Sequence, residues 1–151
     1  MNQLLHNGYV FDPVAASDMV SLYYCSELSF VICTAQAEYI PIEAFREVFL
    51  RISGIIREHS VKHLLFDKRA LRTFHQPSME WYFTIWKPSV GALGLTNHFK
   101  ILPELEWFRE AVRAGKHELF SKFGEDFLAG ITITYVNNEE EAIDAIIATG
   151  T

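Results

Sequence analysis

The amino-acid sequence predicts an α/β fold, in which a mixed, mostly parallel sheet carries an N-terminal hairpin and about four helices. After the hairpin, short apolar runs typical of buried strands alternate with stretches of helical periodicity. Because parallel neighbours need a crossover connection, this alternation gives the order ββαβαβαβα. The 151 residues are enough for one domain with a real core, and no internal repeat divides them.

Residues 1–18 have mixed polarity and no clean period, so we expect a lead-in segment that carries at most a short strand. Residues 19–151 are predicted to form a single domain. It begins with a hairpin over residues 19–35, which are rich in β-branched and aromatic side chains. In this hairpin Cys25 is expected opposite Phe30 and not opposite Cys33, so both cysteines are predicted to be buried thiols without a disulfide.

Prolines mark the starts of three helices. Pro41 precedes apolar residues spaced three and four apart, which predicts an amphipathic helix that ends near His59. Pro77 begins a second helix, which should stop before Pro88 because proline disfavours a helical residue ahead of it. Pro103 opens a third helix, whose pattern allows a break near Gly115.

Short apolar runs at residues 61–66, 98–102 and 131–136 supply the remaining strands. The last run leads to Asn138, which can cap a helix, and Glu141 follows at the spacing of a capping box. The glutamates here also favour the positive end of a helix dipole. The sequence therefore predicts a final helix after Asn138.

Composition excludes several classes of function. The net charge of -6 and the absence of any concentrated Lys/Arg stretch disfavour nucleic-acid binding. The apolar runs are strand-sized, and the first residues lack the features of a signal peptide, so we expect no membrane span. Together with the unpaired cysteines, this indicates a cytoplasmic protein.

Several stretches resemble the SpoIIAA-like branch of the STAS fold over roughly residues 19–148. They are "HLLFD" followed by a basic loop and an aromatic helix, the glycine-containing loop before "HFKIL", and "ITITYVNNEEEAIDAII". The resemblance implies a small regulatory or interaction domain, related to bacterial anti-sigma factor antagonists and to lipid-binding domains. In those antagonists a serine just after the strand-ending aspartate is phosphorylated. Here Lys68, Arg69 and Ala70 follow Asp67, so that hydroxyl is missing and a phosphoswitch is not expected.

Asp67 ends a predicted strand at the edge where open α/β sheets place their ligands. An aspartyl-phosphate acceptor would also need an acidic pair for Mg²⁺, and neither hairpin strand ends in one. We therefore favour an aspartate that orders the following turn and pairs with Lys68, Arg69 or Arg72. Alternatively, these three cations receive a small anion or a partner's acidic patch, although a solvated loop is the simpler interpretation.

Metal and nucleotide chemistry find no support. His59 and His63 are four residues apart, but they straddle a helix end and a strand start, which is not the arrangement of a zinc helix. Neither a glycine-rich phosphate loop nor a GxSxG elbow is present. We predict no catalytic residues, no metal and no cofactor.

The helix that contains "MEWYFTIWK" has more apolar residues than one buried face can absorb. We hypothesise that Trp81, Ile85 and Trp86 form a homodimer contact or the wall of a ligand pocket, because Trp is a favoured interface anchor. An ordinary core helix with a large aromatic share is the alternative.

The leading hypothesis is a non-enzymatic STAS-like domain that binds another protein, including a second copy of itself. The alternative is a small-molecule or lipid-binding module with an apolar pocket between the sheet and residues 77–87. An enzyme that uses Asp67 ranks third. A tightly packed interior under this helix favours the first hypothesis, and an apolar cavity with cations at its rim favours the second. The candidate binding residues are Asp67, Lys68, Arg69, Arg72, Trp81, Ile85 and Trp86.

Overall fold

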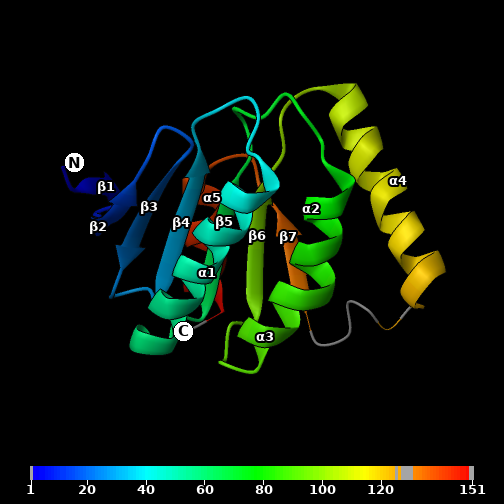
Figure 1. The fold of residues 1–151 in the computed structure, drawn as a ribbon. Helices are drawn as coiled ribbons and strands as arrows, with labels where there is room; N and C mark the ends of the chain where they lie inside the picture. Colours follow the sequence, from blue (N-terminus) through cyan, green and yellow to red (C-terminus); the bar gives the residue numbers. More distant parts are fainter. Residues whose placement is uncertain (1, 125, 127–130, 150–151) are drawn as a thin grey trace.

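The computed structural model describes residues 2–124, 126 and 131–149, which form a seven-stranded sheet with helices on both faces (Figure 1). The strands are β1 (Leu4–His6), β2 (Tyr9–Ala16), β3 (Val20–Cys25), β4 (Phe30–Ala35), β5 (His63–Asp67), β6 (Asn97–Ile101) and β7 (Thr132–Tyr135). The helices are α1 (Ile42–His59), α2 (Gln76–Trp81), the π-helix η1 (Tyr82–Trp86), α3 (Lys87–Gly91), α4 (Glu106–Phe123) and α5 (Glu139–Ala148).

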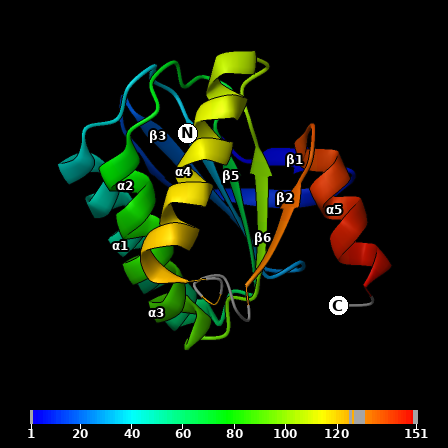
Figure 2. The ribbon, with the colours of Figure 1, turned by 90° about the vertical axis from the view of Figure 1, so that its right-hand side faces the viewer.

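The sheet runs in sequential order from β1 to β7, so each strand pairs with its neighbour in the sequence. The pairs from β1 to β4 are antiparallel and those from β4 to β7 are parallel, with a helical crossover between successive parallel strands. Helices α1 to α4 cover one face and α5 covers the other (Figure 2). The predicted α/β class with a mixed sheet is confirmed, and the sheet is parallel from β4 to β7.

The N-terminal residues contribute more than the short strand expected of a lead-in. β2 pairs with β3 along most of its length, and Phe11 is fully buried with its ring centroid 5.8 Å from that of Phe30. His6 contacts Glu140 of α5 through a 3.1 Å side-chain hydrogen bond. Hydropathy does not reveal β2, because its exposed positions include the apolar Val10 and Val14, so the alternation of buried and exposed side chains is not an alternation of apolar and polar residues.

The hairpin over residues 19–35 forms as predicted, with β3 antiparallel to β4. Cys25 lies opposite Phe30, and both cysteines are buried free thiols. Helix α5 also begins as predicted, because the Asn138 side chain accepts a 2.9 Å hydrogen bond from the Glu141 amide. The Glu141 carboxylate accepts in turn from the Asn137 amide at 2.6 Å, one residue earlier than in a standard capping box.

Two expected helix interruptions are wrong. The second helix continues past Pro88 to Gly91, because the π turn of η1 joins α2 to α3 and places Pro88 in the first turn of α3, where a missing amide donor costs least. Helix α4 passes through Gly115 without a break. Gly115 is a contact position, since a Cβ atom there would lie 2.6 Å from Gln76 Oε1 and 2.7 Å from Met79 Sδ. Its lack of a side chain lets α4 approach α2.

No helix of the described residues is both long and apolar enough to cross a membrane.

We predict that Gly115→Ala destabilises the protein by about 1–3 kcal/mol, because the new methyl group overpacks the contact with α2. The matched control is Gly54→Ala in α1, where nothing lies within 4 Å of the new atom. The control should gain about 1 kcal/mol from helix propensity. Urea denaturation measures both free energies of unfolding, and equal effects of the two substitutions would contradict the close packing of α4 on α2.

Candidate functional site

An apolar cavity of about 70 Å³ lies at the carboxyl edge of the parallel strands, between the sheet and the layer formed by α1, α2, η1 and α4. Phe66 of β5 and Lys100 of β6 contribute its sheet side, and the loop before α2 contributes Lys68 and Phe74. The lining residues are Tyr39, Ile40, Phe45, Phe66, Lys68, Leu71, Thr73, Phe74, His75, Ser78, Met79, Tyr82, Phe83, Lys100, Phe108 and Val112. This is the edge at which open α/β sheets bind ligands.

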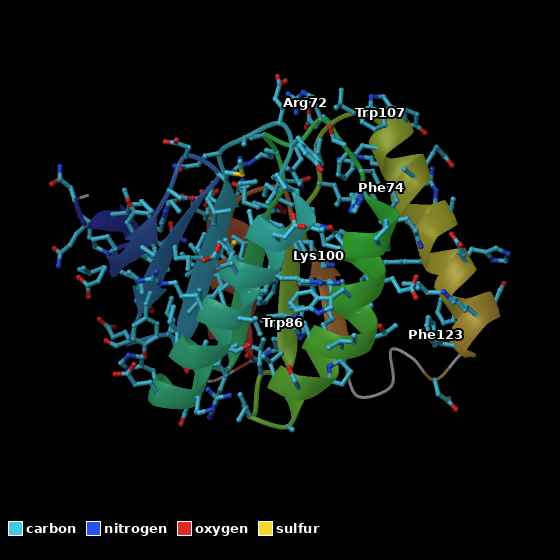
Figure 3. The ribbon with its side chains drawn as sticks, viewed as in Figure 1. Arg72, Phe74, Trp86, Lys100, Trp107 and Phe123 are labelled. Atoms are coloured by element: carbon cyan, nitrogen blue, oxygen red, sulfur yellow. The ribbon has the colours of Figure 1, made fainter. Side chains whose placement is uncertain are left out.

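Lys100 projects from β6, the strand beside the edge strand β7, into the helical layer. Side chains alternate along β6, so His98 and Lys100 share one face while Phe99 and Ile101 belong to the core on the other face. Lys100 is only 2% exposed, and Figure 3 shows it over β6 among the surrounding helices. A strand position that usually holds an aliphatic residue therefore holds a buried amine.

The lining residues described in the structure include two lysines and no aspartate or glutamate. The side chains of Lys68 and Lys100 are hydrogen-bonded to each other. Lys100 Nζ also lies 4.5 Å from the centroid of the Tyr82 ring and 4.4 Å from that of Phe83. Aromatic faces and a second amine thus take the place of a counter-ion.

A second buried lysine lies against the same two rings. Lys87 at the start of α3 has no exposed surface, and its Nζ lies 5.0 Å from the Tyr82 centroid and 4.8 Å from that of Phe83. Neither Lys87 Nζ nor the ring nitrogens of His98 have a hydrogen-bond partner among the described residues. Half-buried Lys68 and the buried Lys87, Lys100 and His98 together form a basic cluster, which is defined here by these four residues.

Burial is the main cause of the altered ionisation in this cluster. It holds the pKa of Lys100 and of Lys87 well below the usual value for lysine, and the neighbouring lysines lower both further. Burial and Lys116 lower the pKa of Lys68 to about 8, partly offset by the hydrogen bond with Lys100. Burial also lowers the pKa of His98 to about 2. With a pKa of about 8, Lys68 is mainly an ammonium at neutral pH, and its hydrogen-bond partner Lys100 is harder to protonate than an exposed lysine because it is buried.

The helix that contains the π segment η1 supplies four buried side chains to this arrangement, Tyr82, Phe83, Trp86 and Lys87. The Lys87 amide donates a hydrogen bond to the Tyr82 carbonyl, five residues back, which is the mark of a π turn. In a regular α-helix these four positions would already lie within an arc of about 140°, so helical spacing alone brings them to one face. Short π segments within helices occur frequently at functional sites.

Asp67 orders the turn that follows β5, as the sequence analysis favoured. Its carboxylate is buried and accepts hydrogen bonds from the Arg69 amide at 3.0 Å and from Arg69 Nη2 at 2.7 Å. Arg69 also binds Glu139 of α5 at 2.8 Å, so this ion pair ties the β5 loop to α5. These carboxylates raise the pKa of the Arg69 guanidinium.

The three cations of this loop separate in the structure. Lys68 lines the cavity, whereas Arg69 and Arg72 line a different groove together with Arg109 of α4. Arg72 Nη1 donates to the carbonyls of Arg69 and Leu71, both at 2.8 Å. The predicted basic mouth of the pocket is therefore formed by Lys68, and the second cation comes from Lys100.

The aromatic residues proposed for an interface occupy three different environments. Trp86 is buried and donates from Nε1 to the Phe49 carbonyl and to Ser53 Oγ, both at 2.8 Å. Trp81 is half-buried under the Arg46 guanidinium, 5.8 Å from the ring centroid. Ile85 is 60% exposed. None of Trp81, Ile85 and Trp86 is among the cavity-lining residues described. From this helix the cavity is lined by Met79, Tyr82 and Phe83, together with Ser78.

In the described part of the chain, no group of three or more His, Cys, Asp or Glu side chains is arranged to hold a metal ion. His59 carries its side chain beside Tyr24, with ring centroids 4.9 Å apart, whereas the His63 ring accepts or donates a 2.9 Å hydrogen bond with Asn97. The two histidines therefore have separate structural contacts.

Comparison with known proteins identifies the fold. A solved structure of the anti-sigma factor antagonist SpoIIAA in its unphosphorylated form superimposes with a TM-score of 0.56, covering 91% of this chain and 96% of that chain. The chain has the SpoIIAA-like STAS fold. The two sequences are 14% identical, so the STAS likeness establishes architecture and the site must be interpreted from this chain's own residues. No family profile and no curated protein matches the sequence.

Sequence reasoning missed the basic cluster although part of its signal is in the sequence. "HFKIL" places His98 and Lys100 two residues apart, the spacing that puts both on one face of a strand. Lys87 received no prediction, because it lies directly before Pro88, where the helix was expected to stop. Its burial follows from the packing of the continued helix against the sheet.

We predict that Lys87→Met raises the free energy of unfolding by at least about 1 kcal/mol at neutral pH, because it removes a buried amine without a hydrogen-bond partner. The matched control is Lys62→Met, at an exposed lysine, which should change stability little. Urea denaturation monitored by circular dichroism measures both.

The advantage of Lys87→Met should shrink as the pH rises toward the usual lysine pKa of about 10.5. The folded-state pKa of Lys87 is lowered, so between this lowered pKa and about 10.5 the unfolded chain binds a proton that the folded chain does not. Wild-type stability therefore increases with pH relative to the variant. A pH-independent difference would show that Lys87 keeps its proton in the folded protein.

Proposed function

We propose that this chain is a non-enzymatic STAS-type regulatory domain that acts by binding, and that its ligand is a small amphiphilic anion. The observation that carries the proposal is an apolar cavity with Lys68 and Lys100 on its wall and no acidic side chain among the lining residues described. Of the two hypotheses drawn from the sequence, a cavity of this kind favours the small-molecule module.

The charge of the cavity supports an anionic head group. Lysines withdrawn from water are stable only when paired, hydrogen-bonded or deprotonated. A carboxylate beside Lys68 would supply the missing counter-charge and accept a charge-assisted hydrogen bond. The chain as a whole carries a net charge of -6, so attraction of an anion is a local property of this cavity.

The size of the cavity supports a compact ligand. A single water molecule needs about 10–15 Å³ of such volume, so a cavity of about 70 Å³ accommodates a short apolar body and not a long acyl chain. Phe45, Phe74, Met79 and Phe108 would enclose that body. A longer lipid would require α2 to move away from α4, against the contact at Gly115.

Ligand occupancy offers a regulatory input at the sheet edge that carries Asp67. Lys68 follows Asp67 directly and the next residue, Arg69, binds both Asp67 and Glu139. A ligand that orders Lys68 would act on the same short loop that presents Arg69 and Arg72 to solvent. Binding in the cavity could thereby alter the surface offered to a protein partner.

We expect isocaproate, a branched carboxylate with a compact body, to bind the purified protein in the cavity. Lys68→Met should weaken this binding by about 1.5–3 kcal/mol, which is roughly tenfold or more, because a charge-assisted hydrogen bond is lost. Isothermal titration calorimetry measures the affinities. Lys62→Met, an exposed lysine outside the cavity, is the matched control and should bind like the wild type.

The uncharged isohexanol tests the anionic head group directly. It should bind more weakly than isocaproate to the wild type and equally weakly to Lys68→Met. Equal affinity of the wild type for the alcohol and the acid, or no effect of Lys68→Met on isocaproate binding, would contradict the proposal.

Self-association is a second proposal, which a different observation favours. Ile85 of η1 and Leu50 of α1 are each 60% exposed. They lie one residue away from the Trp86 to Phe49 hydrogen bond that joins the two helices. Half-buried Trp81 continues this surface toward Arg46. Adjacent exposed apolar side chains of this kind are typical of an interface between protein chains.

Light scattering at high protein concentration should report a dimer for the wild type, with a shift toward monomer for Trp81→Ala and for Ile85→Glu. Ile147→Glu provides a matched control, because Ile147 is 47% exposed on α5, on the opposite face of the sheet. A monomeric wild-type protein removes this proposal and leaves the cavity proposal intact.

A further inference from the structure

We infer that Lys100 is an imine-forming residue, and that the ligand class of the cavity is an α-keto acid with a compact apolar side chain. This inference rests on the proposed binding function, since it uses the same cavity. It adds a covalent, reversible step between the Lys100 Nζ atom and the carbonyl carbon of the ligand.

The position of Lys100 carries the inference. Its amine is on the cavity wall, is almost fully buried and is hydrogen-bonded to Lys68. The lining residues described offer it no carboxylate, and its other close neighbours are the faces of Tyr82 and Phe83. Lysines that act as nucleophiles toward carbonyl groups are activated in this way, by an apolar surrounding and an adjacent cation.

The ionisation of the two lysines agrees with this geometry. Burial and three neighbouring lysines hold the pKa of Lys100 well below its usual range, so the amine is more readily neutral and nucleophilic than that of an exposed lysine. Lys68, with a pKa of about 8, keeps its proton at neutral pH and can donate it. Lys87 packs against the same rings but is not among the lining residues, so we assign the nucleophile to Lys100.

The adjacent ammonium and amine match the head group of an α-keto acid, in which a carboxylate and a carbonyl group occupy neighbouring carbon atoms. The carboxylate would lie against Lys68 and the carbonyl carbon against Lys100. The apolar side chain would then extend among Phe45, Phe74, Met79 and Phe108. A simple carboxylate would bind Lys68 but could not react with Lys100. An aldehyde without a carboxylate could react with Lys100 but would not pair with Lys68.

The step balances without an outside oxidant or reductant. The Lys100 nitrogen forms a bond to the carbonyl carbon while the Lys68 ammonium protonates the carbonyl oxygen, and a proton from the attacking nitrogen restores Lys68. Lys68 then protonates the resulting hydroxyl group, which leaves as water, and the second proton of the Lys100 nitrogen returns to Lys68. The products are a neutral imine and one water molecule. Lys68 delivers both protons to the oxygen and recovers two from the Lys100 nitrogen, so its own proton count is unchanged.

Borohydride trapping tests the inference. The full chain is incubated with α-ketoisocaproate and reduced with sodium borohydride, which converts an imine into a stable secondary amine. We expect intact-mass spectrometry to show one adduct with the mass of the ligand less one oxygen atom. Peptide mapping should place it on Lys100, and the adduct should decline at least about tenfold in Lys100→Met. Isocaproate, which has no carbonyl group, should give no adduct but should suppress the reaction by competition.

The controls separate the role of Lys100 from general lysine reactivity. Lys62→Met, at an exposed lysine, should retain the adduct in full. Lys68→Met should slow adduct formation, because it removes the proton donor and the partner of the carboxylate. Circular dichroism checks that Lys100→Met is folded, and mapping of the wild-type adduct gives the site independently of any variant.

The outcomes distinguish this inference from the proposed function. Saturable isocaproate binding with no trapped α-ketoisocaproate adduct on Lys100 would leave the binding function standing and overturn the imine. Adducts spread over surface lysines, in equal amounts in the wild type and in Lys100→Met, would also overturn it. If neither compound binds, the proposed function and the inference fail together.

Discussion

The site depends on one constraint, which is that the basic cluster is packed into an aromatic interior without a counter-charge. Lys87 and Lys100 both place their Nζ atoms within 5.0 Å of the Tyr82 and Phe83 ring centroids. Taking an ammonium out of water costs several kcal/mol even after the surrounding protein relaxes. The fold tolerates these side chains because their amines can release protons, lie on aromatic faces and, for Lys68 and Lys100, bond to each other.

The surrounding elements are arranged so that this cluster lies beside a cavity. The helix that contains η1 directs Tyr82, Phe83, Trp86 and Lys87 inward, and Trp86 fixes η1 to α1 through its hydrogen bonds to Phe49 and Ser53. On the other side, α4 approaches α2 at Gly115. The helices are therefore held at both ends of the cavity, and an amphiphilic ligand would supply the contacts that the interior lacks.

The Asp67 loop connects this cavity to the surface. In the STAS fold this loop follows a central strand, and here Asp67 is engaged by Arg69, which also reaches Glu139 of α5. The ion pair fixes the backbone on one side of Lys68, while Lys68 itself turns toward Lys100. Two neighbouring residues of this loop thus make contacts on opposite faces of the sheet, Arg69 with α5 and Lys68 with the cavity. In the proposed function, this loop is the point at which ligand binding and partner binding communicate.

Sequence alone determined the α/β class, the hairpin, the helices and most parallel strands, because each depends on a local hydrophobic period. It also indicated that Asp67 orders the turn after its strand. It showed further that Lys68, and not a phosphorylatable serine, follows Asp67. Only the tertiary structure decided that Lys68 lines the same cavity as Lys100 while Arg69 and Arg72 lie outside it. It also decided that Lys87 and His98 are buried. The physical reason is that the spacing of apolar residues shows which face of a helix or strand is buried. The surroundings of a polar side chain depend instead on strand register and helix packing between residues far apart in the sequence. The π turn of η1 escaped prediction because it departs from the regular helical period, and β2 escaped it because exposed valines hide the alternation of its buried and exposed positions.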